Sequence, residues 1–269
     1  MDKKRVAIHG VPRSGTTWLA EIINSSPHVR YKYQPLFSYE LKNYLNEQSG
    51  EAEIKDFFCK LDEINAPFLD QEEGRKQGIV PVFSKGDITH IVYKEVRYHH
   101  IIRNMLVGDP GLKVVGIIRS PLATLNSWIK SPREFRKDLG WDELEEWRFA
   151  EKRNNNKPEE FFGFEKWKEV ALLFHELEAI YPDNFYLVTY DQLLHHTMAE
   201  VRKLFSFIEL DISGQTLGFI DRSRNTDINT TYSVFKKRDD DEAWKHTLHP
   251  HIIEEVVRDL KNTELEKYL

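Results

Sequence analysis

A short run near the start of the chain has the side chains and spacing of an anion-binding loop. Within the stretch HGVPRSGTTWL it reads Arg13, Ser14, Gly15, Thr16 and Thr17. Backbone N–H groups, hydroxyls and a forked guanidinium are the donors that bind phosphate best. The two glycines match the frame G-x-x-x-x-G of a nucleotide-phosphate loop, but threonine stands where that motif requires lysine. The run predicts an anion site that is not an ordinary ATP or GTP loop, and a tight turn without a ligand is the simpler alternative.

Two predicted elements would position this run. The apolar stretch 5–9 is typical of a short strand, and residues 16–25 have the apolar pattern of a helix. A strand, a glycine-containing turn and a helix direct the unpaired N–H groups of the first helical turn toward one point. The helix dipole adds partial positive charge there. We therefore expect the anion to lie between the strand and the helix.

The sequence PRSGTTWL resembles the loop with which sulfotransferases bind the 5′-phosphosulfate of the donor PAPS (3′-phosphoadenosine 5′-phosphosulfate). GVPRSGTT, followed by PHVR at residues 27–30, is similar to tyrosylprotein sulfotransferases, whereas the cytosolic enzymes usually carry lysine at the place of Arg13. The resemblance implies that residues 13–17 hold the phosphosulfate and that Arg13 is also catalytic. It further implies that Trp18 stacks on the adenine of the donor.

A second pair of phosphate-binding residues follows the apolar run 113–118, which is typical of a buried parallel strand. This run ends in Arg119, and Ser127 follows eight residues later, within a predicted helix over residues 122–130. A forked cation and a hydroxyl are a suitable pair for a phosphate dianion. Their spacing resembles the site at which sulfotransferases hold the 3′-phosphate of PAPS.

Another strand candidate, residues 90–96, contains Lys94 and Glu95 near its end. In open α/β sheets ligands bind beyond the carboxyl ends of the strands, so both residues are expected near the chemistry. The position of Lys94 resembles that of the catalytic lysine of sulfotransferases. A general base must also remove the proton of the acceptor. Glu95 and His99 are the main candidates, and the spacing does not decide between them.

The bases of known sulfotransferases are replaced in this chain. The cytosolic enzymes carry histidine two residues after the strand lysine, where this chain has Val96. Tyrosylprotein sulfotransferases carry a pair of glutamates in the segment after the first helix, where this chain has Tyr33 and Gln34. This departure argues against a tyrosylprotein acceptor. His100 and Glu40 are more distant candidates for the base.

Three further residues are expected at the donor. Tyr190 ends the strand candidate 184–190, and the segment that begins there resembles the Y-E-x-L segment that places a tyrosine near the adenine. An ordinary aromatic residue at a sheet edge is the alternative. Lys236 and Lys237 lie in the predicted loop 221–241, where cytosolic relatives have a basic segment that closes over the 3′-phosphate. The glycine of that segment is missing here.

These patterns predict an α/β fold of three layers, with a mostly parallel central sheet of about four to five strands and helices on both faces, similar to P-loop NTPases. The four strand candidates alternate with helical patterns, whereas the aromatic segment 29–37 has no clean period. The connection 70–87 is rich in glycine, proline and charge, and it predicts either an exposed loop or a functional lid. We expect one sulfotransferase domain over residues 1–269.

Composition limits the class of protein. With 40% hydrophobic and 30% charged residues, the chain has the composition of a globular protein, and its net charge of -6 argues against a nucleic-acid partner. We find no signal peptide and no apolar run long enough to span a bilayer. The single cysteine, Cys59, is expected to be a buried apolar residue and fits a reducing compartment. We therefore expect a cytoplasmic enzyme that is a monomer or homodimer.

The activity that the resemblance implies is transfer of a sulfuryl group from PAPS to a hydroxyl or amine, without a metal. A small molecule, a carbohydrate or a lipid is the expected acceptor. The alternatives are a P-loop kinase-like phosphotransferase and a PAP- or nucleotide-binding module without turnover. A kinase needs a loop lysine and a strand-end aspartate for Mg²⁺, whereas this strand ends in Arg119. A binding module would keep both phosphate sites and lack a base.

Overall fold

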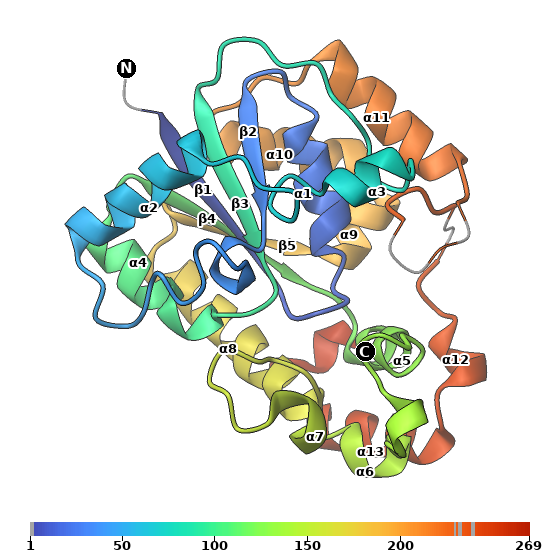
Figure 1. Ribbon diagram of the computed structural model, residues 1–269. Coiled ribbons are helices and arrows are strands. Elements are labelled where there is room, and N and C mark those ends of the chain that lie inside the picture. The colour runs from blue at the N-terminus through green and yellow to red at the C-terminus, as the bar shows by residue number, and fades with distance from the viewer. Residues whose placement is uncertain (1–2, 229, 231–232, 238–239) are drawn as a thin grey trace.

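The central element of the fold is a parallel sheet (Figure 1). A computed structural model describes residues 3–228, 230, 233–237 and 240–269 of the chain. Within these residues the sheet has five strands in the order β2-β3-β1-β4-β5, and every neighbouring pair is parallel. The strands are β1 (Lys4–His9), β2 (Val29–Tyr33), β3 (His90–Glu95), β4 (Leu112–Ile118) and β5 (Phe185–Thr189). The predicted α/β class is confirmed.

Helices cover both faces of this sheet and extend beyond its carboxyl edge (Figure 1). In the described part of the chain the α-helices are α1 (Thr16–Asn24), α2 (Glu51–Glu63), α3 (Glu72–Lys76), α4 (Ile102–Gly108), α5 (Pro121–Ile129), α6 (Glu143–Glu146), α7 (Glu151–Asn154), α8 (Phe164–Ile180), α9 (Tyr190–His195), α10 (Thr197–Phe207), α11 (Gly214–Asn225), α12 (Trp244–Thr247) and α13 (Pro250–Leu260). Short 3₁₀ turns are η1 (Pro35–Phe37), η2 (His99–Ile101), η3 (Lys137–Leu139) and η4 (Glu266–Tyr268).

The two faces of the sheet have separate hydrophobic cores. Because successive strand residues point to opposite faces, Val6 and Ile8 of β1 pack with α1, α9, α10 and α11, whereas Ala7 packs with α2, α4 and α8. All three side chains are completely buried. Burying one large aliphatic side chain stabilises the fold by roughly 1.5–3 kcal/mol, so both faces hold the sheet firmly in place. The carboxyl ends of the strands therefore form a well-supported edge.

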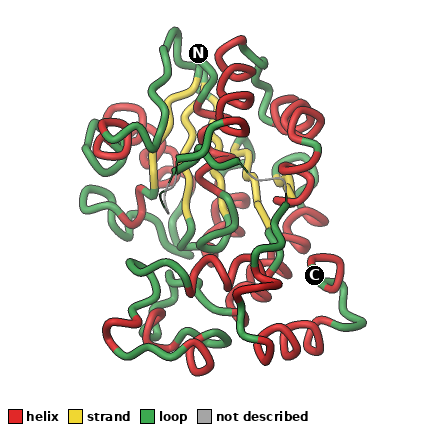
Figure 2. The backbone as a smooth tube through the Cα atoms, turned by 90° about the vertical axis from the view of Figure 1, so that its right-hand side faces the viewer, coloured by secondary structure: helices red, strands yellow, loops and turns green. Residues whose placement is uncertain are grey.

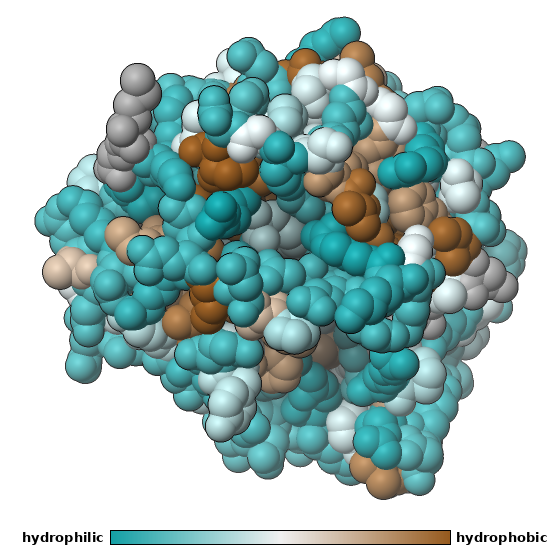
Figure 3. Space-filling model, turned by 45° about the horizontal axis from the view of Figure 1, so that its top comes forward, coloured by the Kyte–Doolittle hydropathy of each residue, from teal (hydrophilic) through white to brown (hydrophobic). Residues whose placement is uncertain are grey.

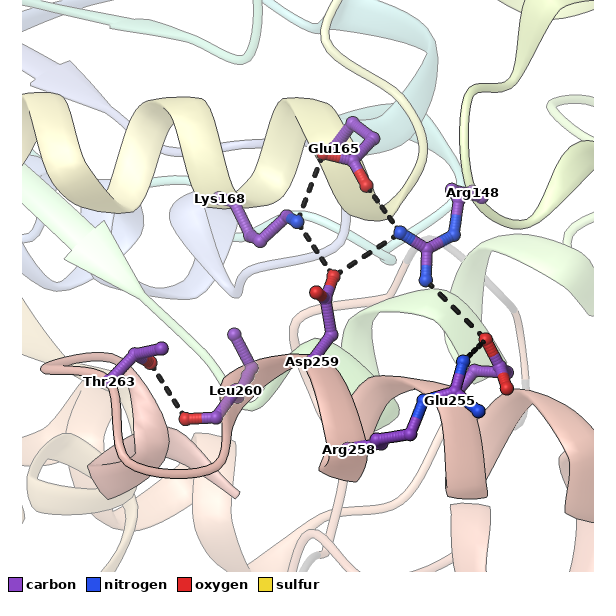
Figure 4. A network of polar contacts seen from close by, with 8 residues as sticks. All are labelled: Arg148, Glu165, Lys168, Glu255, Arg258, Asp259, Leu260 and Thr263. Carbon is purple, nitrogen blue, oxygen red and sulfur yellow. Dashed lines mark hydrogen bonds and ion pairs between the residues drawn. The ribbon is translucent and has the colours of Figure 1, made fainter.

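The strands lie in one half of the molecule, and helices and loops form the other half (Figure 2). There Arg148 joins two helices through ion pairs to Glu165 of α8 at 2.7 Å and to Asp259 of α13 at 3.2 Å (Figure 4). Lys168 of α8 adds an ion pair of 2.7 Å to Asp259. These side chains are partly exposed, so each pair contributes at most about 1 kcal/mol. The network therefore fixes the position of α13 against α8 but adds little to the free energy of unfolding.

The surface seen in Figure 3 is mostly hydrophilic and carries separate apolar patches. Tyr39, Val82 and Val107 are the most exposed large apolar residues of the described chain. Among the helices of the described residues, none combines the length and the apolar character that crossing a membrane requires.

Several expectations about local structure are corrected by the fold. The aromatic segment 29–37 contains the edge strand β2. The predicted loop 221–241 begins inside α11. Cys59 is exposed rather than buried, because α2 turns Phe57, Phe58 and Leu61 toward the core and Cys59 away from it.

Candidate functional site

A cavity of about 690 Å³ lies at the carboxyl edge of the sheet. The turn after β1, the end of β3, the residue after β4 and the first residue of α9 after β5 all line it. This is the place where open α/β sheets bind ligands. Most of the predicted site residues line it together: Arg13, Gly15, Thr16, Thr17, Trp18, Lys94, Arg119, Ser127, Tyr190 and Lys236.

The turn between β1 and α1 has an unusual backbone. Gly15 has a φ of 89°, and a Cβ atom there would come within 2.5 Å of the Tyr190 ring. Arg13 also has a positive φ, 74°, which is strained for a residue with a side chain. A Cβ on Gly10 would meet Ile117 and Thr16 at 2.7–2.8 Å. The turn is therefore held in one close-fitting shape, and the first turn of α1 faces the cavity with Thr16 and Thr17.

The two predicted phosphate sites are directly connected. Arg13 Nε donates to Ser127 Oγ over 3.1 Å, and Arg119 Nη1 donates to the carbonyl oxygen of Arg13 over 2.7 Å. Arg119 is held in turn by Trp167, whose indole N–H donates to its carbonyl oxygen. Arg119 and Ser127, which follow Arg13 by 106 and 114 positions in the sequence, thus form one cationic centre with it.

A carboxylate already engages Arg119. Asp241 accepts from its Nε at 2.7 Å and also from its Nη2. The guanidinium lies 4.8 Å from the centroid of the Tyr190 ring, which covers its face. Arg119 therefore presents the flat, forked geometry that suits a carboxylate or a phosphate.

Two aromatic residues flank this cationic centre. Trp18 and Tyr190 meet edge to face with their centroids 6.2 Å apart. Trp18 Nε1 donates to Ser223 Oγ of α11 over 3.0 Å, which fixes the indole at the cavity wall. Both rings line the cavity, as an adenine-binding surface would require.

Lys94 also lines the cavity, at the end of β3. Its Nζ is 4.3 Å from the centroid of the Tyr33 ring. Burial lowers the pKa of the Lys94 ammonium to about 7, because the charged form loses its water. The same cause raises the pKa of the neighbouring Glu95 carboxyl to about 8. Lys94 is therefore poised between its charged and neutral forms near neutral pH.

Glu95 and His99 do not reach the cavity lining. Glu95 points to the other face of β3, where its Oε1 accepts from the backbone N–H of Leu36 over 2.8 Å. His99 is completely buried, and its Nδ1 lies 3.2 Å from Nδ1 of His9. Burial lowers the pKa of His99 well below its usual value. Neither of the two residues that we expected as the base therefore lines the cavity.

Two other expected donor residues also lie outside the lining. Ser14 is completely buried, and its hydroxyl has no hydrogen-bond partner among the described residues. Its backbone N–H bonds to the carbonyl of Val11, so it serves the turn itself. Lys237 is exposed, whereas its neighbour Lys236 lines the cavity. Arg238, part of the expected basic segment, lies outside the described residues.

A family model for the sulfotransferase domain matches residues 3–267. The chain belongs to the sulfotransferase family. This confirms the resemblance drawn from the loop PRSGTTWL. Mouse (Mus musculus) carbohydrate sulfotransferase 5 is 26% identical over 294 residues, which cover 88% of this chain and 73% of the relative.

Solved structures with a similar fold include a sulfotransferase and a retinol dehydratase. Mouse sulfotransferase SULT7A1 complexed with PAP has 12% identity and a TM-score of 0.55, and the match covers 99% of this chain and 86% of the other. Retinol dehydratase in a complex with retinol and PAP has 14% identity and a TM-score of 0.58, with 98% and 83% covered. At these identities the likeness shows the fold alone, and it agrees with the parallel sheet described above.

This sulfotransferase has a second group of lining residues that the sequence patterns did not reveal. These residues line the same cavity: Tyr33, Gln34, Phe37, Phe68, Arg97, Arg133, Glu134 and Arg153. Tyr33 and Phe37 each lie against Phe68, with ring centroids 5.4 and 6.2 Å apart. The sequence indicated only Tyr33 and Gln34, which stand where tyrosylprotein sulfotransferases carry glutamates, and the aromatic content of residues 31–37. Within the described residues no cluster of three or more acidic, histidine or cysteine side chains has the geometry of a metal site.

The polar members of this group are held in place by one another. Arg97 Nη1 donates to Gln34 Oε1 over 2.7 Å, and its Nε donates to Glu160 over 3.1 Å. Arg97 also lies 4.0 Å from the centroid of the Phe37 ring. Gln34 has a φ of 44°, a strained value that turns the chain from β2 into η1. The sulfotransferase thus builds one wall of its cavity from an aromatic surface fixed by buried polar contacts.

Proposed function

We propose that this sulfotransferase transfers the sulfuryl group of PAPS to a hydroxyl of a carbohydrate acceptor. The observation that carries the proposal is the contact between two anion sites in one cavity. The turn after β1 and the pair Arg119 and Ser127 meet through the hydrogen bonds of Arg13. PAPS carries a phosphosulfate and a separate 3′-phosphate, so it requires two such sites, which ATP does not.

The residues that line the cavity fit the negative charges and the adenine of this donor. Residues 15–17 would bind the 5′-phosphosulfate through backbone N–H groups and hydroxyls, with Arg13 beside it. Arg119 and Ser127 would bind the 3′-phosphate, and Lys236, which also lines the cavity, would add charge there. Trp18 and Tyr190 would hold the adenine. We propose that Ser14 only shapes the turn and that Lys237 only contributes to the surface.

The reaction is an in-line displacement at sulfur. The acceptor oxygen forms a bond to sulfur while the bond between sulfur and the 5′-phosphate oxygen breaks, and that oxygen keeps the electron pair as PAP leaves. Arg13 and Lys94 would balance the charge on the transferring group. Removing such a donor typically lowers the rate by about a hundred- to a thousand-fold.

The aromatic wall supports a carbohydrate as the acceptor. The rings of Tyr33, Phe37 and Phe68 form a surface next to Lys94, and Phe37 and Phe68 are about 40% exposed. Aromatic faces bind the C–H faces of sugar rings while nearby polar groups bind the hydroxyls. The similarity to a carbohydrate sulfotransferase points to the same class. A small aromatic molecule or a lipid alcohol is the main competing acceptor.

Two steps test this proposal. Thermal unfolding is measured with PAP, with ATP and Mg²⁺, and without ligand; we expect stabilisation by PAP. Radiolabelled PAPS is then incubated with methyl glycosides of glucose, galactose and N-acetylglucosamine, and with p-nitrophenol and a long-chain alcohol. Labelled glycoside as the main product supports the proposal. Stabilisation by ATP and Mg²⁺ alone would favour a kinase-like enzyme. PAP binding without transfer of the label would favour a binding module. Label found only on p-nitrophenol or on the long-chain alcohol would favour another class of acceptor.

The cellular setting is a separate prediction. We expect a cytoplasmic protein that forms one domain and is a monomer or homodimer. Cell fractionation and light scattering of the purified chain would test it.

A further inference from the structure

The site described so far lacks a group that takes the proton of the acceptor. Glu95 and His99 lie behind the wall, and the lining residues that the structure describes include no histidine. Burial raises the pKa of Tyr33 to about 12, which makes its phenol a poor proton acceptor near neutral pH. Two carboxylates remain among the described lining residues, Glu73 and Glu134. Glu73 belongs to exposed α3 and accepts from Gln77.

Glu134 has the position that a base requires. Its Oε2 lies 3.7 Å from Nη1 of Arg13, the residue that would contact the transferring group. That oxygen is buried and has no hydrogen-bond partner among the described residues. A buried carboxylate oxygen without a hydrogen bond is costly, which is a reason to look for a function. The charge of Glu134 also acts on Lys94 and Tyr33, so Glu134 lies near both of these residues as well as near Arg13.

The backbone around Glu134 is firmly held although the residue follows a helix end. Its N–H donates to the carbonyl of Ser131 over 3.0 Å, and its own carbonyl accepts from the indole of Trp128. The next residue, Phe135, is buried against Trp128 with ring centroids 5.1 Å apart. Trp128 and Ser127 are neighbours on α5. The same helix therefore positions a phosphate-binding serine and Glu134.

We propose that Glu134 is the catalytic base of this sulfotransferase. This inference rests on the proposed transfer from PAPS to a hydroxyl. The O–H bond of the acceptor breaks as its oxygen attacks sulfur, and the proton moves to the carboxylate of Glu134. Arg13, which is 3.7 Å from this carboxylate, keeps it close to the transferring group. Glu95 is then a positioning residue that holds η1 through Leu36, and His99 is part of the core.

The variant Glu134→Gln tests the proposal, with Glu145→Gln as the matched control. Glu145 is an exposed glutamate of α6 that pairs with Lys152 outside the cavity. For the fastest glycoside acceptor we expect E134Q to lower kcat by about a hundred- to ten-thousand-fold and to lose the acidic limb of the pH–rate profile. PAP should bind E134Q at least as tightly as wild type. E145Q should match wild type in both measurements.

Two further measurements separate a base from a residue that merely orients Arg13. At a pH where p-nitrophenol is already ionised, transfer to this acceptor needs no base, so E134Q should lose far less activity with it than with the glycoside. Added formate should restore part of the activity of Glu134→Ala. Equal losses with both acceptors and no rescue by formate would show an orienting role and overturn the proposal. So would a kcat of E134Q within threefold of wild type.

The experiments distinguish a failure of the proposed function from a failure of the assignment of Glu134. If wild type binds PAP but modifies no alcohol, the proposed transfer is wrong and the assignment of Glu134 falls with it. If wild type transfers label to the glycoside and E134Q does so equally well, only the assignment of Glu134 is wrong.

Discussion

Arg119 and Asp241 are paired through both nitrogens of the guanidinium fork, although they lie 122 positions apart in the sequence. The same Nε and Nη2 atoms are those that a 3′-phosphate would engage. Asp241 follows the basic segment that contains Lys236. If Arg119 binds the 3′-phosphate as proposed, the carboxylate of Asp241 would compete with that phosphate for Arg119.

Asp241→Asn removes the competing charge. We expect PAP to bind about fivefold more tightly to D241N, which corresponds to about 1 kcal/mol for a partly exposed ion pair. Asp211→Asn is the control, since Asp211 is exposed and does not line the cavity. Isothermal titration calorimetry measures both. Weaker PAP binding by D241N would show instead that Asp241 orients Arg119 for the phosphate.

Gly15→Ala tests the shape of the anion turn. The added methyl group meets Tyr190 at 2.5 Å and also forces alanine to a φ of 89°. We expect loss of measurable PAP binding together with a lower melting temperature. Gly140→Ala is the matched control, because Gly140 has a φ of 74° but has open space around its Cα. If both variants lose stability equally and both bind PAP, contact with Tyr190 does not shape the site.

The lowered pKa of Lys94 predicts that the activity of the enzyme decreases as pH rises. Burial lowers this pKa to about 7, so the ammonium is present below that pH and is lost above it. We expect kcat/KM to fall as pH rises through about 7, because the neutral amine cannot stabilise the transferring group. In Lys94→Arg the charge persists, so this basic limb should disappear even if the rate is lower. A basic limb that stays in K94R would assign it to another group.

Comparing two variants of Glu95 tests whether this residue has a structural or a catalytic role. Glu95→Gln keeps an oxygen that accepts from Leu36, whereas Glu95→Ala leaves that buried N–H without a partner. We expect E95A to lower the free energy of unfolding by about 1–3 kcal/mol and E95Q by much less. Chemical denaturation measures both. A kcat loss of a thousand-fold in E95Q with unchanged stability would restore Glu95 as the base.

The donor half of the site could be predicted from sequence because its motifs are local. A strand, a turn and a helix adjacent in the chain bring residues 13–18 together, whereas Arg119 directly follows β4 and Ser127 lies on α5. Parallel strands then bring the two groups to the same edge. No long-range information was needed beyond the rule that ligands lie at that edge.

The other half could not be predicted in this way. Glu134 lies after a helix end, and its approach to Arg13 depends on how α5 packs and on Trp128. In the edge strand β2 the polar residue Lys32 is buried and forms an ion pair with Asp70 at 2.7 Å, which the residue types of this short strand do not indicate. Asp70 belongs to the connection 70–87, which contains α3 and contributes Gln71 and Val80 to the cavity. These contacts arise from tertiary packing, which the spacing of residues in one segment does not encode.

The central claim is that the cavity holds a donor with two separate anionic groups. Calorimetric titration of PAP and of adenosine 5′-phosphate into wild type and Arg119→Ala tests it most directly. We predict that wild type prefers PAP by about ten- to a hundred-fold, since the 3′-phosphate adds charge-assisted hydrogen bonds, and that R119A loses most of this preference. Equal affinity of wild type for the two nucleotides, or an undiminished preference in R119A, would contradict the account.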